Sequence, residues 1–112
     1  MLKTYTIVSG DTQTSCGILI YDTEKDTYTV QIDPEHDSSD MPAIMAICAE
    51  RDKYTLSGKE ALRLVRSRVI PPDRQNIDQI MEKIGAAYYS ELAILEYTGG
   101  RCCRDNFYIE RV

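Results

Sequence analysis

The sequence has little of what catalytic and metal sites usually require. Its single histidine, His36, lies in an acidic stretch over residues 33–40, and nothing near it in sequence would fix its tautomer. We therefore expect a surface histidine rather than the general base of a cysteine hydrolase. The acidic stretch lacks the central glycine and terminal glutamate of an EF-hand loop. The pair Gly99-Gly100 follows a predicted helix instead of opening one, which is unlike a phosphate-binding loop.

Cysteine spacing argues against the common zinc sites. The sequence has four cysteines but no C-x-x-C pair and no His-x3-His spacing. Cys102 and Cys103 are adjacent, a poor geometry for a mutual disulfide or for chelating one ion. Cys16 and Cys48 lie among apolar residues and are predicted to be small core residues. We expect no metal, no cofactor and no catalytic residue.

Long apolar segments are also missing. No run approaches the roughly 18 residues needed to span a bilayer. The first residues lack an apolar segment with a small-residue cleavage site, so we expect no secretory signal. The sequence therefore predicts a cytoplasmic protein with no membrane partner and no need of disulfides.

Positive charge is scarce in the first half of the chain. The net charge is −5, which argues against general affinity for nucleic acid. Residues 1–56 carry four Lys/Arg and ten Asp/Glu, whereas residues 57–112 carry nine and eight. This uneven distribution can give the protein two faces of opposite charge, either of which a protein partner could bind. The alternative is an ordinary solvated surface on which charge is locally uneven.

Tryptophan is absent, and eight of the nine aromatic residues are tyrosine. Tyrosine packs an apolar ring while its hydroxyl stays wet, so it suits both the edge of a core and an interface. Tyr88-Tyr89 precedes a predicted short helix and Tyr97 ends it.

Alternating residue patterns predict strands over residues 2–8 and 27–32, with a closing strand over 106–112, and a nearly continuous apolar run predicts another strand over residues 16–21. Five polar residues, 22–26, connect the second and third strands at hairpin length. The N-terminal third is therefore predicted to be an antiparallel sheet with one buried face.

Helix signals occupy the middle and the end of the chain. Residues 41–49 favour a short helix capped by Asp40, with a strand as the alternative. Ser57 and Glu60 have the spacing of a capping box, which predicts a helix start. From Asp73 to Gly85 the apolar spacing is i, i+3, i+4, i+7, carried by Ile77, Ile80, Met81 and Ile84.

The last helix is predicted to begin after a capping Ser90, to run to about Tyr97 and to end at Gly99. Arginines crowd the polar side of the helix that begins near Ser57 and continue to Arg74. They can form a solvated face or contact an acidic protein partner or a nucleic acid. These arginines are Arg63, Arg66, Arg68 and Arg74.

Three motifs follow one another along the chain: Gly17-Ile18-Leu19-Ile20-Tyr21-Asp22 with the strand Tyr28-Thr29-Val30, then Val69-Ile70-Pro71-Pro72-Asp73-Arg74, then Leu92-Ala93-Ile94-Leu95 with Gly99-Gly100-Arg101-Cys102. In this order they resemble the small N-terminal subdomain of HipA-type serine/threonine kinases of bacterial toxin–antitoxin systems. Arg101 stands where that family usually has aspartate. The sequence holds none of the ATP-binding or catalytic-loop residues of the kinase core.

The resemblance implies a free-standing version of a regulatory or structural subdomain, which docks onto a separately encoded HipA-like kinase core as an antitoxin or accessory subunit. We expect a single α+β domain over residues 1–112, with an antiparallel, partly barrel-like sheet and three to four short flanking helices. The alternatives are a nucleic-acid-associated regulator that uses the arginine-rich helix and a small hydrolase that uses Cys102 or Cys103. The expected partner-binding residues are Arg63, Arg66, Arg68, Pro71, Pro72, Arg74, Tyr88, Tyr89 and Tyr97.

Overall fold

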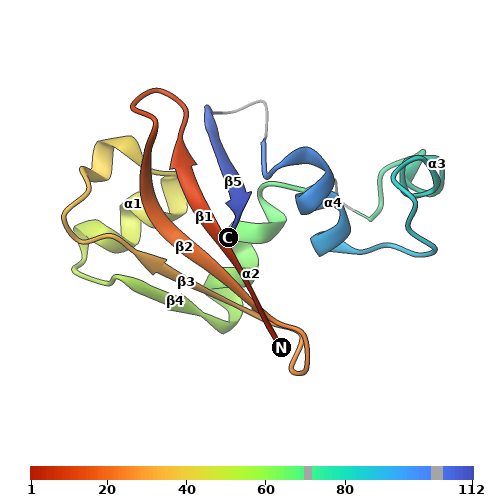
Figure 1. Ribbon diagram of the computed structural model, residues 1–112, viewed down its shortest axis with the longest axis horizontal. Coiled ribbons are helices and arrows are strands. Elements are labelled where there is room, and N and C mark those ends of the chain that lie inside the picture. The colour runs from red at the N-terminus through yellow and green to blue at the C-terminus, as the bar shows by residue number, and fades with distance from the viewer. Residues whose placement is uncertain (70–71, 102–104) are drawn as a thin grey trace.

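The protein is an α+β fold built on one five-stranded antiparallel sheet (Figure 1). The structure, a computed structural model, describes residues 1–69, 72–101 and 105–112. The strand order is β4-β3-β2-β1-β5. The bounds are β1 Leu2–Ser9, β2 Thr14–Asp22, β3 Thr27–Ile32, β4 Thr55–Ser57 and β5 Phe107–Arg111. The sheet is open, because β4 and β5 are its two edges and do not pair with each other among the described residues. The α+β prediction is confirmed, without barrel closure.

Each predicted strand is confirmed within one or two residues at either end. Every second residue of a strand faces the core, as Tyr5 and Ile7 do on β1. A bulge between Ile7 and Val8 shifts the β1–β2 register, so that Ile7 pairs with Gly17 and Val8 with Ser15. Strand β4 was not predicted, because a three-residue strand is too short to show an alternating pattern.

Helices α1 (Ala43–Glu50) and α2 (Gly58–Arg66) cover one face of the sheet (Figure 1). The core between the sheet and the helices is apolar, with Val30, Met45, Leu56 and Val65 almost fully buried. Leu95 of α4 (Glu91–Thr98) joins the same cluster. The helix predicted over residues 41–49 is therefore confirmed.

The predicted start of α2 is confirmed, because Ser57 directly precedes its first residue, but the predicted capping hydrogen bonds of Asp40 and Ser57 are not formed among the described residues. Asp40 belongs to a short 3-10 helix, η1 (Ser38–Asp40), and its carboxylate accepts hydrogen bonds from Ser9 and Thr12 instead of capping α1. Among the described residues, Ser57 makes no side-chain capping bond to α2. Glu60, the other half of the expected capping box, pairs with Lys53. In both places a partner outside the helix captures the side chain.

Helix α3 (Ile77–Lys83) projects away from the sheet at the far end of the molecule (Figure 1). It starts four residues after the predicted Asp73, and residues 73–76 are exposed. Met81 is its only buried residue. The radius of gyration is 13.9 Å, slightly above the roughly 13 Å expected for a compact chain of this length. The outlying position of α3 accounts for the difference.

The predicted boundaries of α4 are confirmed. The hydroxyl of Ser90 accepts a hydrogen bond from the Ala93 amide at 3.2 Å, and Gly99 ends the helix with a φ of 67°. The Gly99 carbonyl then accepts from the Ile109 amide at 2.7 Å. The end of α4 is thereby joined to the outer edge of β5.

No helix within the described residues combines the length and the apolar character needed to cross a membrane.

Candidate functional site

Asp40 is hydrogen-bonded to both Ser9 and His36, an order that differs from the serine–histidine–aspartate order of a serine hydrolase. Ser9 Oγ donates to Asp40 Oδ1 at 2.7 Å, and His36 Nε2 lies 3.0 Å from both Oδ2 and the carbonyl oxygen of Asp40. Both atoms are acceptors, so Nε2 carries the proton. The carboxylate stands between serine and imidazole, whereas a serine hydrolase places the imidazole in the middle.

The expectation of a surface histidine is also wrong, because the His36 side chain is only 12% exposed. The hydroxyl donors Ser9 and Thr12 hold the pKa of the Asp40 carboxyl below its usual value. The network therefore fastens the β1–β2 turn to η1, and its role is structural.

The described cysteines, Cys16 and Cys48, are buried. Cys16 is fully buried, and burial raises the pKa of its thiol to about 11. Burial also raises the pKa of Cys48. Both thiols are protonated at neutral pH, which fits core residues rather than nucleophiles. Cys102 and Cys103 lie outside the described residues. Within the part of the chain that the structure describes, no group of three His, Cys, Asp or Glu side chains could hold a metal ion.

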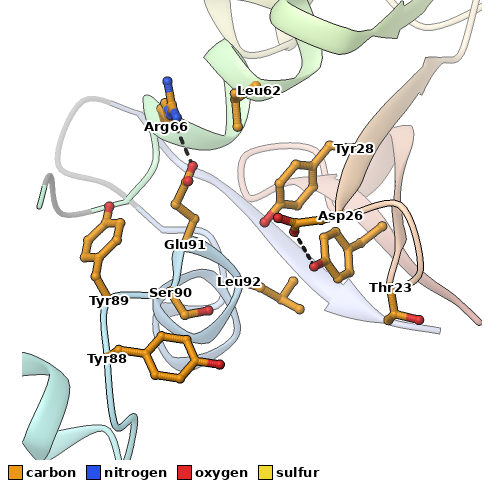
Figure 2. Close-up of a pocket in the computed structure, with 11 residues that line it drawn as sticks. Thr23, Asp26, Tyr28, Leu62, Arg66, Tyr88, Tyr89, Ser90, Glu91 and Leu92 are labelled. Carbon is orange, nitrogen blue, oxygen red and sulfur yellow. Dashed lines mark hydrogen bonds and ion pairs between the residues drawn. The ribbon is translucent and has the colours of Figure 1, made fainter.

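Three of the nine predicted partner-binding residues, Arg66, Tyr88 and Tyr89, line a groove of about 470 Å³, which we call the tyrosine groove (Figure 2). Three segments form it: the β2–β3 hairpin, the second half of α2 and the start of α4. It is lined by Tyr21, Thr23, Asp26, Tyr28, Leu62, Arg66, Tyr88, Tyr89, Ser90, Glu91 and Leu92.

The hairpin wall of the tyrosine groove carries a tyrosine pair and a carboxylate. Tyr21 and Tyr28 pair across the β2–β3 register, with ring centroids 4.9 Å apart and planes inclined by 41°. Tyr21 Oη donates to Asp26 Oδ1 at 2.5 Å. Asp26 has a φ of 53°, a left-handed conformation that aspartate and asparagine tolerate better than most residues. The turn therefore places the Asp26 carboxylate against the hydroxyl of Tyr21, five residues earlier in the chain.

Electrostatics follow from this geometry. The hydrogen bond to Asp26 raises the pKa of Tyr21 to about 12. Burial, with the negative charge of Glu91 next in importance, raises the pKa of Tyr28 well above its ordinary value. Both phenols stay protonated across the physiological range.

The opposite wall consists of an ion pair flanked by two tyrosines. Arg66 Nε donates to Glu91 Oε2 at 3.3 Å (Figure 2). Tyr88 is 78% exposed, whereas Tyr89 is half-buried. A second hollow of about 460 Å³ adjoins the groove and shares this ion pair and Tyr89; its other lining residues are Val69 and Pro72.

Four of the predicted partner-binding residues thus lie together: Arg66, Pro72, Tyr88 and Tyr89. Arg63 is exposed on α2 and lines neither hollow. Arg74 lies in a separate depression formed by residues 74–79. Tyr97 is 61% exposed on α4 but does not line the groove, and Pro71 lies outside the described residues.

Arg68 is a structural residue and is not available at the surface. Its side chain is 8% exposed, and its guanidinium forks onto Asp105 with distances of 3.0 and 2.8 Å. It also donates to the carbonyl oxygens of Gly100 at 2.6 Å and Phe107 at 2.9 Å. Because Arg68 is committed to these internal contacts, the predicted arginine cluster does not exist as one surface.

Sequence reasoning missed the two carboxylates of the groove, Asp26 and Glu91, and the Tyr21–Tyr28 pair. The hairpin prediction contained the signal for the pair, since a five-residue connection between strands ending at Tyr21 and starting at Thr27 nearly aligns the tyrosines. Comparison of the chain with protein-family models, with curated proteins and with solved structures gives no match.

Proposed function

We propose that the protein is a non-catalytic protein-binding module and that the tyrosine groove is its contact surface. The supporting observation is the convergence there of Arg66, Tyr88 and Tyr89 from two segments far apart in the sequence. Tyrosine and arginine are the residue types that most often carry the binding energy of protein interfaces. Tyr88, with 78% of its surface exposed, leaves a large aromatic ring for a partner to cover.

The chemistry of the described residues supports binding rather than catalysis. The described residues that line the groove include no cysteine or histidine. The described cysteines are buried, and the hydroxyl of Ser9 is committed to Asp40. A partner that contributes the reactive groups is consistent with this composition.

The resemblance to the HipA N-terminal subdomain suggests the class of partner, a separately encoded HipA-like serine/threonine kinase core. Two strands that carry the resemblance, β2 with Gly17–Asp22 and β3 with Tyr28–Val30, also supply the hairpin wall of the groove. The module would act in the cytoplasm as an antitoxin or accessory subunit. The nucleic-acid alternative has less support, because Arg68 is buried and Arg74 lies apart from Arg66.

Co-purification tests the proposal with two matched pairs of variants. A tagged wild-type chain should retain a kinase-like protein, identified by mass spectrometry, from the source cells. Tyr88→Ser and Arg66→Ala should each reduce the amount retained by about tenfold, as expected of interface hot spots. Tyr97→Ser and Arg63→Ala remove an exposed tyrosine and an exposed arginine outside the groove and should leave it unchanged.

Three results would count against the proposal. The first is the absence of a kinase-like partner from the wild-type sample. The second is equal loss in the groove variants and their controls. The third is salt-sensitive nucleic-acid binding that disappears in Arg63→Ala, which would support the alternative regulator.

A further inference from the structure

We infer that the tyrosine groove receives a positively charged side chain, lysine or arginine, from its protein partner. The inference rests on the proposed function, and it adds the chemistry of the group that is bound. Three features of the groove carry it: its unbalanced negative charge, its tyrosine rings and the geometry of the hairpin turn.

The charges that line the groove do not balance. Asp26 and Glu91 are carboxylates, and Arg66 is the only basic residue among the described residues that line the groove. The guanidinium of Arg66 is paired with Glu91. Asp26 is bound by the hydroxyl of Tyr21, which is a neutral donor and leaves the negative charge in place. The groove therefore offers a cation one carboxylate with no described cationic partner.

Tyrosine faces supply the second half of a cation site. A cation gains energy from the negative face of an aromatic ring within about 6 Å of its centroid. The chain already uses this contact twice outside the groove: Arg101 lies 4.4 Å from the Tyr108 ring, and Arg111 lies 5.6 Å from the Tyr5 ring. A volume of about 470 Å³ is within the range of sites that enclose a small ligand, so a long side chain fits.

The hairpin turn holds the carboxylate in place before any partner arrives. Asp22 Oδ1 accepts from the amides of Glu24 and Lys25, which closes the turn. The left-handed Asp26 then points its carboxylate to Tyr21. A preformed site loses little entropy on binding. Asn tolerates the same backbone conformation, so Asp26→Asn removes the charge and keeps the turn.

The experiment uses n-butylammonium as a stand-in for a lysine side chain and 1-butanol as a neutral probe of the same length. Each is titrated into the full chain labelled with ¹⁵N, and amide chemical shifts are followed by NMR. Butylammonium should shift the amides of groove residues in a saturable manner, and 1-butanol should not. Asp26→Asn and Glu91→Gln should each weaken the affinity by about two- to fivefold, the size of one partly exposed cationic contact.

Glu110→Gln is the matched charge control, because Glu110 is an exposed carboxylate on β5, away from the groove. It should leave the affinity for butylammonium unchanged. Equal shifts from both probes, the absence of saturable shifts at the groove, or an unchanged affinity in Asp26→Asn would each overturn the inference.

Failure of this inference is distinguishable from failure of the proposed function. A kinase-like partner that is lost with Tyr88→Ser but retained by the double variant Asp26→Asn/Glu91→Gln leaves the protein-binding module standing and overturns the cation site. Saturable butylammonium binding without any protein partner in the co-purification supports the cation site and overturns the protein-binding module.

Discussion

Replacing Arg68 with methionine should lower the free energy of unfolding by about 3–4 kcal/mol. Among the described residues, Arg68 donates two hydrogen bonds to Asp105 and one each to the carbonyl oxygens of Gly100 and Phe107. Breaking a buried ion pair by removing one partner typically costs about 3–5 kcal/mol. The Asp105 side chain is 25% exposed, so water recovers part of that loss and places the expected value toward the lower end. The carbonyl oxygens of Gly100 and Phe107 also lose their donor, but this loss is not simply added to that of the ion pair, because both depend on the same side chain.

Urea unfolding followed by circular dichroism measures this change, because a chain of this size is expected to unfold in one cooperative step. The slope of free energy against urea should be unchanged, since the surface exposed on unfolding stays the same. Arg63→Met is the control: Arg63 is an exposed arginine on α2, and its loss should cost less than about 0.5 kcal/mol. Arg68→Lys should recover less than half of the loss, because an ammonium cannot fork onto a carboxylate and two carbonyls together.

A cost below about 1 kcal/mol for Arg68→Met, or equal costs for Arg68→Met and Arg63→Met, would refute the structural role of Arg68. Should Arg68→Met fail to fold, Asp105→Asn provides the measurement in its place. The amide keeps one acceptor for the guanidinium, so it should cost about 1–2 kcal/mol.

Three further predictions concern single positions. Ser90→Ala should cost about 1 kcal/mol in urea unfolding because it removes the cap of α4, whereas Ser57→Ala, which removes no cap, should cost less than half as much; equal costs would refute the assignment of caps. Asp26→Asn should return the pKa of Tyr21 from about 12 toward 10 in an ultraviolet titration of the phenols. Because the pKa of Tyr21 is higher in the folded state, its hydrogen bond stabilises the fold below pH 10, and this stabilisation is lost as the pH rises through 12. In Asp26→Asn the free energy of unfolding should therefore change less between pH 10 and pH 12. An unchanged titration of Tyr21 would contradict the hydrogen bond. Gly100→Ala should cost more than about 1 kcal/mol, measured by urea unfolding, because its φ is 70° and a β5 side chain lies 3.1 Å from the position of the new Cβ; a neutral result would show that the turn can shift.

Local rules predicted the elements whose signals are local. Alternation over residues 27–32 marks β3 with its correct bounds, because its side chains meet a core on one face and water on the other. Ser90 and Gly99 mark α4 because a cap and a left-handed residue act within one turn of the helix they terminate.

The errors arise where a distant residue competes for a side chain. Asp40 has the right spacing to cap α1, yet Ser9, 31 residues earlier, captures its carboxylate. Arg68 looks like part of a basic surface with Arg66, but Asp105, 37 residues later, draws it inward. Spacing along the chain contains no information on such pairings, because they depend on how distant elements pack. Asp40 meets the end of β1 from η1, and Arg68 meets Asp105 just before β5.

The same limit applies to the candidate site. The sequence favoured Arg66, Tyr88 and Tyr89 from their chemistry, and they do share one groove. Asp26 and Glu91 were missed, because a carboxylate in a polar hairpin and one at a helix start look like ordinary solvated residues. Their importance follows only from the side chains that face them.

The strand order also determines when the protein can complete its fold during synthesis. Strands β1, β2 and β3 form a consecutive meander that can assemble while the rest of the chain is still on the ribosome. The free edge of β1 pairs only with β5, through contacts such as Ile7 with Ile109. Until residues 107–111 emerge, that edge remains a template for strands of other chains. We therefore expect the nascent chain to be most open to strand pairing with other chains in the interval between the emergence of β3 and that of β5.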